Sequence, residues 1–563
     1  MFSSCGEKEP QGIIDEEVLK NAEGVETLVV SAYSNLTQAN WGATVFNWTC
    51  GGIYGGDANL GSDYGNQAVF DMGFESYRIL STNSYLNEKW IWLYRGSKQI
   101  EMALKLIDEV TDMDPNLKKI RKGELYFLRA LFYFEGVKVF GPFIPYIDET
   151  NKENDPKVYN DKDIYPNILS DTNKAIENLP DKPAELGRAY AWGAKMLKAK
   201  ILMQQGNMSA AKPILADVLN NGTTASGLKF ALSNDLNDNW SCAMDNKSPE
   251  SIFEIQFSSD GSLNGNIGMS VCYPTNGGPG GCCGFYQPSF ELVNSYQVDD
   301  DGLPFLNAEY RNKPSVNTYT GNRPPIIYNN DATIAVDPRL DFGIGRVGIP
   351  YKDYGPASGN WIADVTNGGC FMPKKHVYLK SEEGTLGRHD MSEGWAPGSA
   401  MNIQYLSVRD AMLLYAECLA NDGELSAAMG WVNQVRKRAA LPVNIIYRED
   451  GEPAANYKVA EYPASHQTFS NKDLCIKAIR LERKLELAME GQRWFDLARW
   501  GGVYMNAEID AYLKYESNFL LKFKDVTPLA ANRTMFPIPQ DQINAMGCDK
   551  NGNFYLQQQN PWK

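Results

Sequence analysis

The sequence predicts a mainly α-helical protein, built as a scaffold of packed helices with one large irregular excursion that contains short strands. Three observations predict this. Before residue 220 and after residue 400, apolar residues recur at three- and four-residue intervals, the spacing of one helix face. Between them, residues 221–400 are rich in Gly, Pro, Asn, Tyr and Trp. One helical pattern also occurs twice, once on each side of this excursion.

These differences in composition and in hydrophobic periodicity divide the chain into four parts. Residues 1–14 form a polar tether and residues 15–220 an N-terminal helical region. Residues 221–400 form the excursion, and residues 401–563 form a second helical region with a closing segment. A compact chain of 563 residues buries a large core, and 43% hydrophobic residues is an ordinary globular composition.

Charge and composition exclude several classes of protein. A formal net charge of −15 disfavours general binding to nucleic acid, which requires basic surface. No apolar run reaches the ~18 residues of a membrane-spanning helix. The 10 cysteines include the adjacent Cys282 and Cys283 but no CxxC pair, and the 3 histidines form no HExxH motif. We therefore expect neither a metal site nor a cofactor.

The first strongly periodic helix is expected over residues 122–140. Leu125, Leu128, Leu131 and Phe134 recur there on one helix face. Gly141-Pro142 should end this helix, because glycine lacks a Cβ and proline lacks an N–H group.

Five matched positions indicate an internal repeat of a helical hairpin. The first copy and the second copy are separated by 217 residues at all five positions: Ala199, Leu202, Gly206, Ala211 and Leu215 match Ala416, Leu419, Gly423, Ala428 and Val432. The spacing resembles a tetratricopeptide (TPR) unit, with small residues where two helices cross and glycine in the turn. The alternative is two unrelated amphipathic hairpins. If the repeat is real, the hairpins stack and the excursion is inserted between them.

The excursion should consist of loops and short strands. Residues 251–257 alternate apolar and polar side chains, which predicts a strand. The glycine-rich residues 277–284 favour irregular structure. Two literal motif matches within it are not expected to bind ligands. Residues 343–348 match GxGxxG without the flanking strand and helix of a dinucleotide site, and residues 297–302 match only part of a calcium loop, so a solvated turn is expected.

A last long helix is expected over residues 471–490, with Ser470 or Asn471 as its N-cap. Glu482, Glu486 and Glu490 lie on one face of it. Such carboxylates could serve a glycosidase as acid and base. We favour structural ion pairs with nearby arginines, because one exposed helix stripe provides no facing carboxylate across a cleft. The nearby arginines are Arg480, Arg483, Arg493 and Arg499.

Aromatic residues outside helical periodicity are the candidate ligand-binding residues. Flat rings offer apolar area, and neighbouring amide or carboxylate groups can bind hydroxyls, which suits sugars or peptides. The candidates are Trp41, Trp48, Tyr54, Asp57, Tyr64, Tyr273, Tyr286, Trp361 and Trp395. The alternative is that these rings pack the loops onto the helices.

The first residues resemble the cleavage end of a bacterial lipoprotein signal. Small residues, Ser3 and Ser4, precede Cys5, and the acidic residues Glu7 and Glu9 follow it. Cys5 is the expected lipidation site. The alternative is a cysteine that only happens to lie near the start.

Several motifs resemble the SusD/RagB family, and they occur in order along nearly the whole chain. They are 128–134 with 140–145, Asp337-Pro338-Arg339, 409–417 with 433–439, 482–501, Pro537-Ile538-Pro539 and Gln559-Asn560-Pro561. The motif at 482–501, which begins with Glu482-Arg483 and contains Glu490-Gly491-Gln492-Arg493-Trp494-Phe495-Asp496, is the most specific of them. These motifs belong to the scaffold and identify no ligand residues.

The resemblance implies a TPR-containing lipoprotein on the outer membrane, anchored by a lipid and facing the exterior. It implies capture of oligosaccharides for a SusC-like TonB-dependent transporter, within polysaccharide utilisation and without catalysis. Ligand contacts would come from the N-terminal loop and the excursion. A peptide-binding member of the same family is one alternative. A helical glycoside hydrolase and a TPR scaffold for protein partners alone are others.

Overall fold

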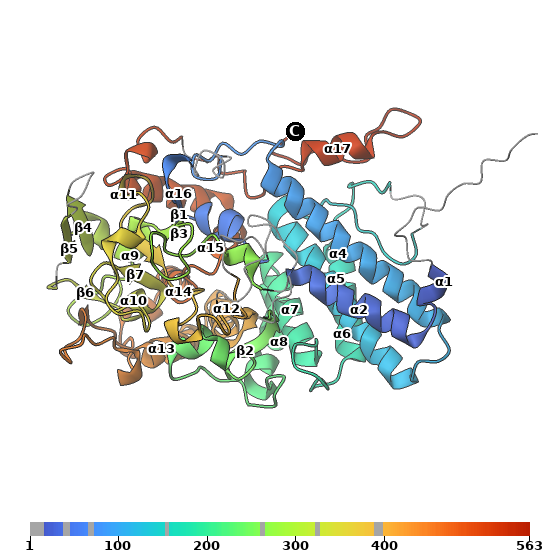
Figure 1. The fold of residues 1–563 in the computed structure, drawn as a ribbon, viewed down its shortest axis with the longest axis horizontal. Coiled ribbons are helices and arrows are strands. Elements are labelled where there is room, and N and C mark those ends of the chain that lie inside the picture. Colours follow the sequence, from blue (N-terminus) through green and yellow to red (C-terminus); the bar gives the residue numbers. More distant parts are fainter. Residues whose placement is uncertain are drawn as a thin grey trace, which may run out of the picture.

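The fold is a row of packed helices that carries an irregular lobe on one side (Figure 1). The computed structural model describes residues 16–37, 45–65, 73–151, 157–258, 265–320, 327–330, 332–387, 398–527 and 529–563. Each helix of the row packs against the next. The row consists of α2 (Ala22–Thr37), α4 (Ser84–Glu109), α5 (Pro115–Phe140), α6 (Tyr165–Asn178), α7 (Ala191–Gln204), α8 (Met208–Asn221), α12 (Val408–Asn421) and α13 (Leu425–Ala439). The short α1 (Glu16–Leu19) packs on α2. The predicted mainly α-helical fold is confirmed.

The predicted repeat is confirmed as two stacked hairpins. The first residues of α7 and α12, Ala191 and Val408, are 217 positions apart, and so are those of α8 and α13. Both turns contain a glycine in the left-handed conformation, Gly206 at φ +83° and Gly423 at φ +84°. Because α8 packs directly against α12, the row continues across the excursion.

Helix α5 is deeply buried along its C-terminal two thirds. From Gly123 to its end at Phe140, every residue except Tyr126 is buried, including Glu135 and Lys138. Lys138 and Lys89 pair with Glu135 at 2.5 and 3.1 Å. Although burial opposes ionisation of Glu135, these lysines lower its pKa to about 2. The helix ends as predicted, with Gly141 at φ +79°.

The excursion begins and ends on one pair of strands. The predicted strand is confirmed as β2 (Ser251–Ile255), which is two residues shorter than expected and buried along its whole length. It pairs antiparallel with β9 (Ile403–Ser407), directly before α12. The other strand pairs in the described residues are β1 (Ala58–Gly61) with β3 (Phe285–Pro288), β4 (Asn317–Thr320) with β5 (Ile327–Asn330), β6 (Ala335–Val336) with β10 (Asn456–Tyr457), and β7 (Ile344–Arg346) with β8 (Phe371–Pro373).

The remaining helices lie outside this row. They are α9 (Phe290–Asn294), α10 (Arg339–Gly343), α11 (Val365–Gly368), α14 (Lys472–Glu486), α15 (Arg493–Arg499), α16 (Gly502–Glu516) and α17 (Gln540–Met546). Helix α14 has the predicted N-cap, because the side chain of Asn471 accepts a hydrogen bond from the N–H of Leu474 at 3.1 Å. It ends at Glu486, four residues earlier than predicted. Single turns of 3-10 or π helix occur at 48–53, 236–239, 242–244, 267–269, 309–312, 359–361, 380–382, 442–444, 467–469 and 521–523.

Two motif matches in the excursion have structural roles. The GxGxxG match at 343–348 forms the end of α10, strand β7 and a turn, and an added Cβ at Gly345 would lie 2.6 Å from the ring of Tyr351. In the acidic turn at 297–302, the side chain of Asp299 accepts the N–H groups of Asp301 and Leu303 at 3.0 and 2.8 Å. The Asp299 carboxylate therefore binds the turn's own backbone.

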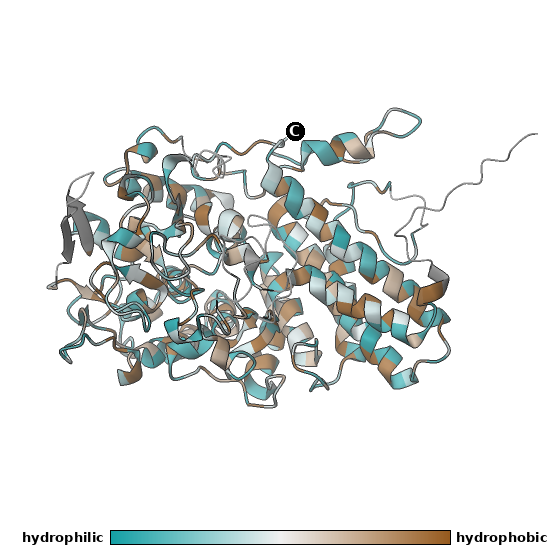
Figure 2. Cartoon of the chain, in the orientation of Figure 1, coloured by the Kyte–Doolittle hydropathy of each residue, from teal (hydrophilic) through white to brown (hydrophobic). Residues whose placement is uncertain are grey.

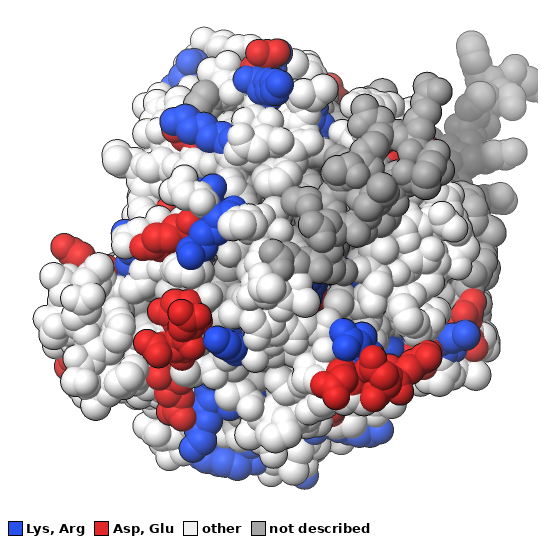
Figure 3. Space-filling model, turned by 90° about the vertical axis from the view of Figure 1, so that its left-hand side faces the viewer, with Lys and Arg blue, Asp and Glu red and all other residues white. Residues whose placement is uncertain are grey.

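Hydrophobic and hydrophilic residues alternate along the helices of the row, as expected for helices with one buried side (Figure 2). On the face shown in Figure 3, acidic and basic side chains form small separate patches with uncharged surface between them. Among the described residues, no helix combines the length and the hydrophobicity needed to cross a membrane.

Candidate functional site

The N-terminal loop and the excursion, the two regions expected to contact a ligand, meet at a strand pair. Strand β1 lies antiparallel to β3, with Gly61 opposite Phe285 and Asn59 opposite Gln287. Just beyond the pair, the N–H of Ser62 donates to the carbonyl oxygen of Gly284 at 2.6 Å. These bonds hold residues 58–65 against the end of the glycine-rich loop.

A third segment, residues 358–367, is bonded to both of the others. The N–H of Thr275 donates to the carbonyl oxygen of Trp361 at 2.9 Å. The side-chain amide of Asn367 donates to the carbonyl oxygens of Gly61 and Ser62 at 2.9 and 3.1 Å. We call the meeting point of residues 58–65, 271–284 and 358–367 the junction.

Gly284 lies at the centre of the junction and requires glycine's conformational freedom, since its φ is +78°. An added Cβ there would contact all three segments: Thr275 Cγ2 at 3.4 Å, Ala363 Cβ at 3.7 Å and Ser62 Cα at 3.7 Å. The loop therefore passes closely between its two neighbours at this residue.

The outer side of the junction combines rings, polar groups and a disulfide. Tyr64 is 56% exposed, and Trp361 is half-buried. The polar residues Asp63, Asn276 and Asn360 are exposed, and Cys282 and Cys283 are half-buried and joined by a disulfide. We call these seven residues the junction surface. Apolar rings beside amide and carboxylate groups are the combination that binds small polar ligands such as sugars.

Five of the nine candidate ligand residues lie in the core instead. Trp48, Tyr54, Asp57, Tyr273 and Tyr286 are each at most 2% exposed. The Trp48 ring packs on Tyr286 with centroids 6.0 Å apart, and the Tyr54 ring packs on Trp494 at 4.5 Å. Their side chains form the packed interior beneath the junction, as the alternative interpretation of these rings expected, and they offer no face on which a ligand could stack.

Asp57 shows what this burial does to a polar candidate. Burial raises its pKa to about 6, although Arg493 and Lys484 oppose the shift. One carboxylate oxygen accepts the N–H of Met489 at 3.3 Å, and Oδ1 has no hydrogen-bond partner among the described residues. Because this carboxyl group is enclosed in the core, a ligand hydroxyl cannot reach it.

Tyr64 and Trp361 are the two candidates that lie on segments of the junction and are not buried. Trp41, Trp395 and the expected lipidation site Cys5 lie outside the described residues. Sequence reasoning missed the other five residues of the junction surface, which are Cys282, Cys283, Asn276, Asp63 and Asn360. Two adjacent cysteines inside a run of glycines were the available signal for the first two.

Glu482 and Glu486 of α14, and Glu490 four residues beyond its end, are enclosed in a network of ion pairs. Arg339 pairs with Glu482 at 2.6 Å and with Glu486 at 3.0 Å, and Arg438 also pairs with Glu486. Glu490 pairs with Lys375 at 2.9 Å and with Arg409 at 3.1 Å. The expectation of structural ion pairs is confirmed. The expected exposed stripe and the expected partners were wrong, because α14 packs into the core and the bases come from other elements.

The charge state of Glu486 bears on the glycosidase alternative. Burial opposes its ionisation, but Arg438 and Arg339 lower its pKa to about 2. A general acid must hold a proton near neutral pH, so its pKa must be raised. Glu486 therefore does not meet the requirement for that role.

A separate groove of about 370 Å³ lies between α2 and β2. Its wall includes Val30, Tyr33, Leu186 and Phe253. Most of this lining is apolar, although Glu254, Gln256 and Arg188 also belong to it. The groove is therefore a weaker candidate for a polar ligand.

The structure is thus a row of helical hairpins with an inserted lobe that bears aromatic rings near its surface. A family model described as "SusD family" matches residues 249–561, which is more than half of the chain. A second, described as "Starch-binding associating with outer membrane", matches residues 17–201. The chain belongs to the SusD family.

Relatives and solved structures agree with this assignment. The chain is 24% identical over 515 residues to SusD-like protein P38 of Formosa agariphila, covering 89% of this chain and 88% of that protein. A laminarin-binding SusD-like protein of known structure is 20% identical with a TM-score of 0.64, covering 96% of this chain and 99% of that one. Surface glycan-binding protein A from Bacteroides thetaiotaomicron, solved with laminarihexaose, is 18% identical with a TM-score of 0.64 and the same coverage. At these identities the solved structures show the shared fold alone.

Proposed function

We propose that this protein binds oligosaccharides at the junction surface and delivers them, chemically unchanged, to a SusC-like TonB-dependent transporter. The observation that carries the proposal is the position of Tyr64 and Trp361. Both rings reach the surface on separate segments that backbone hydrogen bonds hold together. A ring-shaped sugar can lie on one aromatic face while amides bind its hydroxyls.

Two further observations support a glycan over other ligands. Asn276, Asn360 and Asp63 are exposed beside the rings and can donate to or accept from hydroxyl groups. Two structures of the same fold carry names that state laminarin or laminarihexaose binding. The first ligands to test are therefore laminari-oligosaccharides, followed by other glycans.

The proposal includes a lipid anchor at Cys5, with the protein on the outer membrane and facing the exterior. Family membership and the motif around Cys5 support it. An anchored binding protein keeps its cargo at high effective concentration near a transporter, so modest intrinsic affinity suffices. Replacing Cys5 by alanine should move the protein from the membrane fraction to the soluble fraction. Retention of Cys5→Ala in membranes would contradict the anchor.

Calorimetric titration tests the binding function. Wild-type protein is titrated with laminarihexaose, with a panel of other oligosaccharides and with peptides. Heat with a glycan and none with peptides is expected. Heat with peptides alone would favour the peptide-binding alternative, and no heat with either would favour a scaffold for protein partners. A reducing-sugar assay in parallel should show no turnover.

Two variants locate the site. Trp361→Ala and Tyr64→Ala should each weaken glycan binding about tenfold, the loss expected for one stacked ring. Trp431, half-buried on α13, and Tyr447, 51% exposed, provide matched controls. Trp431→Ala and Tyr447→Ala should bind as the wild type does. If glycan affinity fell equally in the two variants and the two controls, the binding site would not lie at the junction surface.

Delivery to a transporter requires its own test. The protein is co-expressed with a SusC-like transporter and purified through a tag on the transporter. Recovery of a complex supports delivery, whereas binding of glycan without any complex would limit the function to capture.

A further inference from the structure

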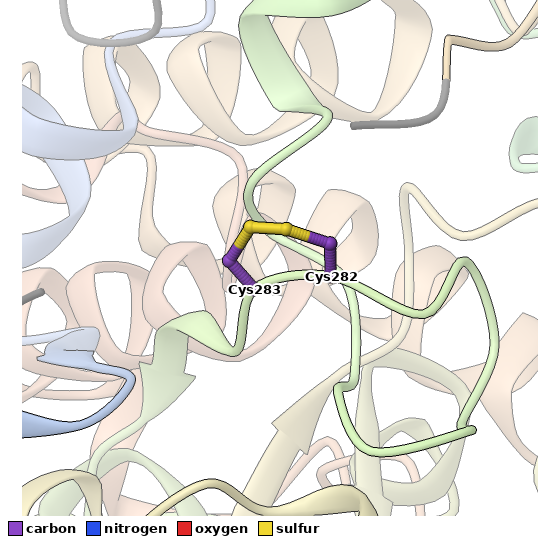
Figure 4. Close-up of a disulfide and its surroundings, with 2 residues drawn as sticks. All are labelled: Cys282 and Cys283. Carbon is purple, nitrogen blue, oxygen red and sulfur yellow. A yellow bond between two sulfur atoms is a disulfide. The ribbon is translucent and has the colours of Figure 1, made fainter. Parts of the chain in front are cut away.

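The junction surface contains a covalent feature that the proposed function does not use. Cys282 and Cys283, neighbours in the chain, are joined by a disulfide at the point where the glycine-rich loop runs into β3 (Figure 4). Both side chains are half-buried, so solvent and ligands reach part of them. The N–H of Cys283 donates to the carbonyl oxygen of Val271 at 3.2 Å, which fixes the backbone beneath the disulfide.

The disulfide lies on the same short loop as the contacts to Trp361. An added Cβ at Gly278 would lie 2.7 Å from Cγ of Trp361, so the ring packs against the loop. The other end of the loop, at Gly284, accepts the N–H of Ser62 two residues before the exposed Tyr64. The loop thus carries the disulfide between the attachment points of the two exposed rings.

The other described cysteines differ from this pair. Cys50, Cys242, Cys272, Cys370, Cys418 and Cys475 are buried free thiols, and Cys548 is an exposed one. Burial raises the pKa of Cys50 and of Cys475 to about 11. Because the thiolate is the reactive form, these buried thiols are poor partners in disulfide exchange. Since the described cysteines other than Cys282 and Cys283 are already free thiols, a mild dithiol reductant should act on the Cys282–Cys283 disulfide among the described residues.

We propose that the Cys282–Cys283 disulfide is a ligand-contacting element of the junction surface, and that its reduction weakens glycan binding. Its sulfur atoms and Cβ carbons form a compact, polarizable, apolar face suited to the C–H side of a sugar ring. Joining the two side chains also removes their S–H donors and fixes their positions, which lowers the ordering cost of binding. This inference rests on the proposed function.

Reduction is a balanced exchange. A dithiol such as dithiothreitol supplies two electrons and two protons, the S–S bond between Cys282 and Cys283 breaks, and two S–H groups form. The reductant becomes a cyclic disulfide. Each freed side chain can then rotate, and the joined apolar face is lost.

The test compares glycan affinity with and without reductant. Wild-type protein is titrated with laminarihexaose, or with the best glycan of the panel, in buffer and in buffer containing dithiothreitol. A thiol assay must show that reduction frees two further thiols. Affinity should fall about fivefold or more, while the melting temperature changes little.

Matched variants separate the disulfide from other effects of the reductant. Cys282→Ser/Cys283→Ser should bind as weakly as the reduced wild type and show no response to dithiothreitol. Cys548→Ser, which alters the exposed thiol elsewhere, should respond as the wild type does. If the double variant does not fold, the glycan affinity of the reduced wild type, with a native melting curve, still tests the role of the disulfide.

The outcomes separate the two proposals. Unchanged affinity after complete reduction would overturn the role of the disulfide and leave glycan binding intact. Free thiols at both positions in protein purified under air would also overturn it. An oxidised protein that binds no glycan would instead overturn the proposed function, and with it this inference.

Discussion

The N–H of Thr275 donates a hydrogen bond to the carbonyl oxygen of Trp361 at 2.9 Å. This bond ties the glycine-rich loop to the segment that carries the half-buried indole of Trp361. A second bond ties the other end of the loop to Ser62, so the loop links the segments that carry Trp361 and Tyr64, in addition to the direct bonds from Asn367. The loop therefore positions the proposed binding surface.

Gly284→Ala should weaken glycan binding by shifting this loop. Gly284 has φ +78°, which costs an alanine about 1 kcal/mol or more. An added Cβ would lie at ordinary van der Waals distances from its neighbours, so it would not clash with them. The strain of the positive φ should therefore be relieved by movement of the loop backbone. Gly552→Ala is the matched control, since Gly552 has φ +84° with nothing within 4 Å. Both variants should lower the melting temperature, and Gly284→Ala alone should lower affinity. Equal affinities would remove the loop from the binding site.

Trp48→Ala should destabilise the fold rather than remove a ligand contact. The indole is 0% exposed and packs against the rings of Phe285 and Tyr286. Truncating a buried tryptophan costs about 3–5 kcal/mol of unfolding free energy. Chemical denaturation measures this loss. Tyr64→Ala, at an exposed ring, should change the unfolding free energy by less than about 0.5 kcal/mol. A small loss for Trp48→Ala would show that its ring is not part of the core.

Glu486→Gln should lower the unfolding free energy by up to about 3 kcal/mol, because it removes one carboxylate partner from the buried Arg339 and Arg438, which still keep Glu482 and Glu250. The folded variant should keep its affinity for glycan, since Glu486 lies away from the junction surface. Glu452→Gln, at an exposed loop residue, is the control and should have little effect. Glycan hydrolysis by the wild type that disappears in Glu486→Gln would instead support the glycosidase alternative.

The sequence predicts the helical scaffold well, because each of its helices and turns depends on residues close together in the chain. Ala199, Leu202 and Gly206 recur 217 positions later, since each helical hairpin needs the same small residues and the same turn. The start of α14 follows from Asn471, whose side chain caps the next residues along the chain. Such features depend on neighbours within a few residues.

The candidate site was harder to predict, because its parts come from distant segments. Trp48 and Tyr64 both lie in a glycine-rich stretch without periodicity, and no local pattern shows that one is buried and the other exposed. The partners of Glu486 are likewise supplied by α10 and α13 rather than by its own helix. Tertiary packing determines which of these rings is buried and which bases pair with Glu486. The family motifs therefore predicted the fold but not the residues exposed for ligand contact.

His376 should make the fold lose stability in acid. Its imidazole is buried between the rings of Phe46 and Trp240, with centroids 4.0 and 4.8 Å away, and its Nε2 donates to the carbonyl oxygen of Met489 at 3.3 Å. Burial lowers the pKa of His376 from the usual 6.5 to about 3, and the positive charge of Lys375 acts in the same direction. The folded state thus keeps the imidazole neutral, whereas the unfolded chain protonates it below about pH 6.5.

The sign of the pH effect follows from this difference in bound protons. Between about pH 6.5 and pH 3 the unfolded state binds one more proton at His376, so stability falls as pH falls, by up to about 1.4 kcal/mol per pH unit. Other buried groups titrate as well, for example Asp57, whose raised pKa acts in the opposite direction. The comparison with His376→Phe isolates the histidine. Unfolding free energies measured by urea denaturation should converge toward acid pH, with the wild type losing more stability than the variant. Parallel curves for the two proteins across this range would show that His376 is protonated equally in the folded and unfolded states.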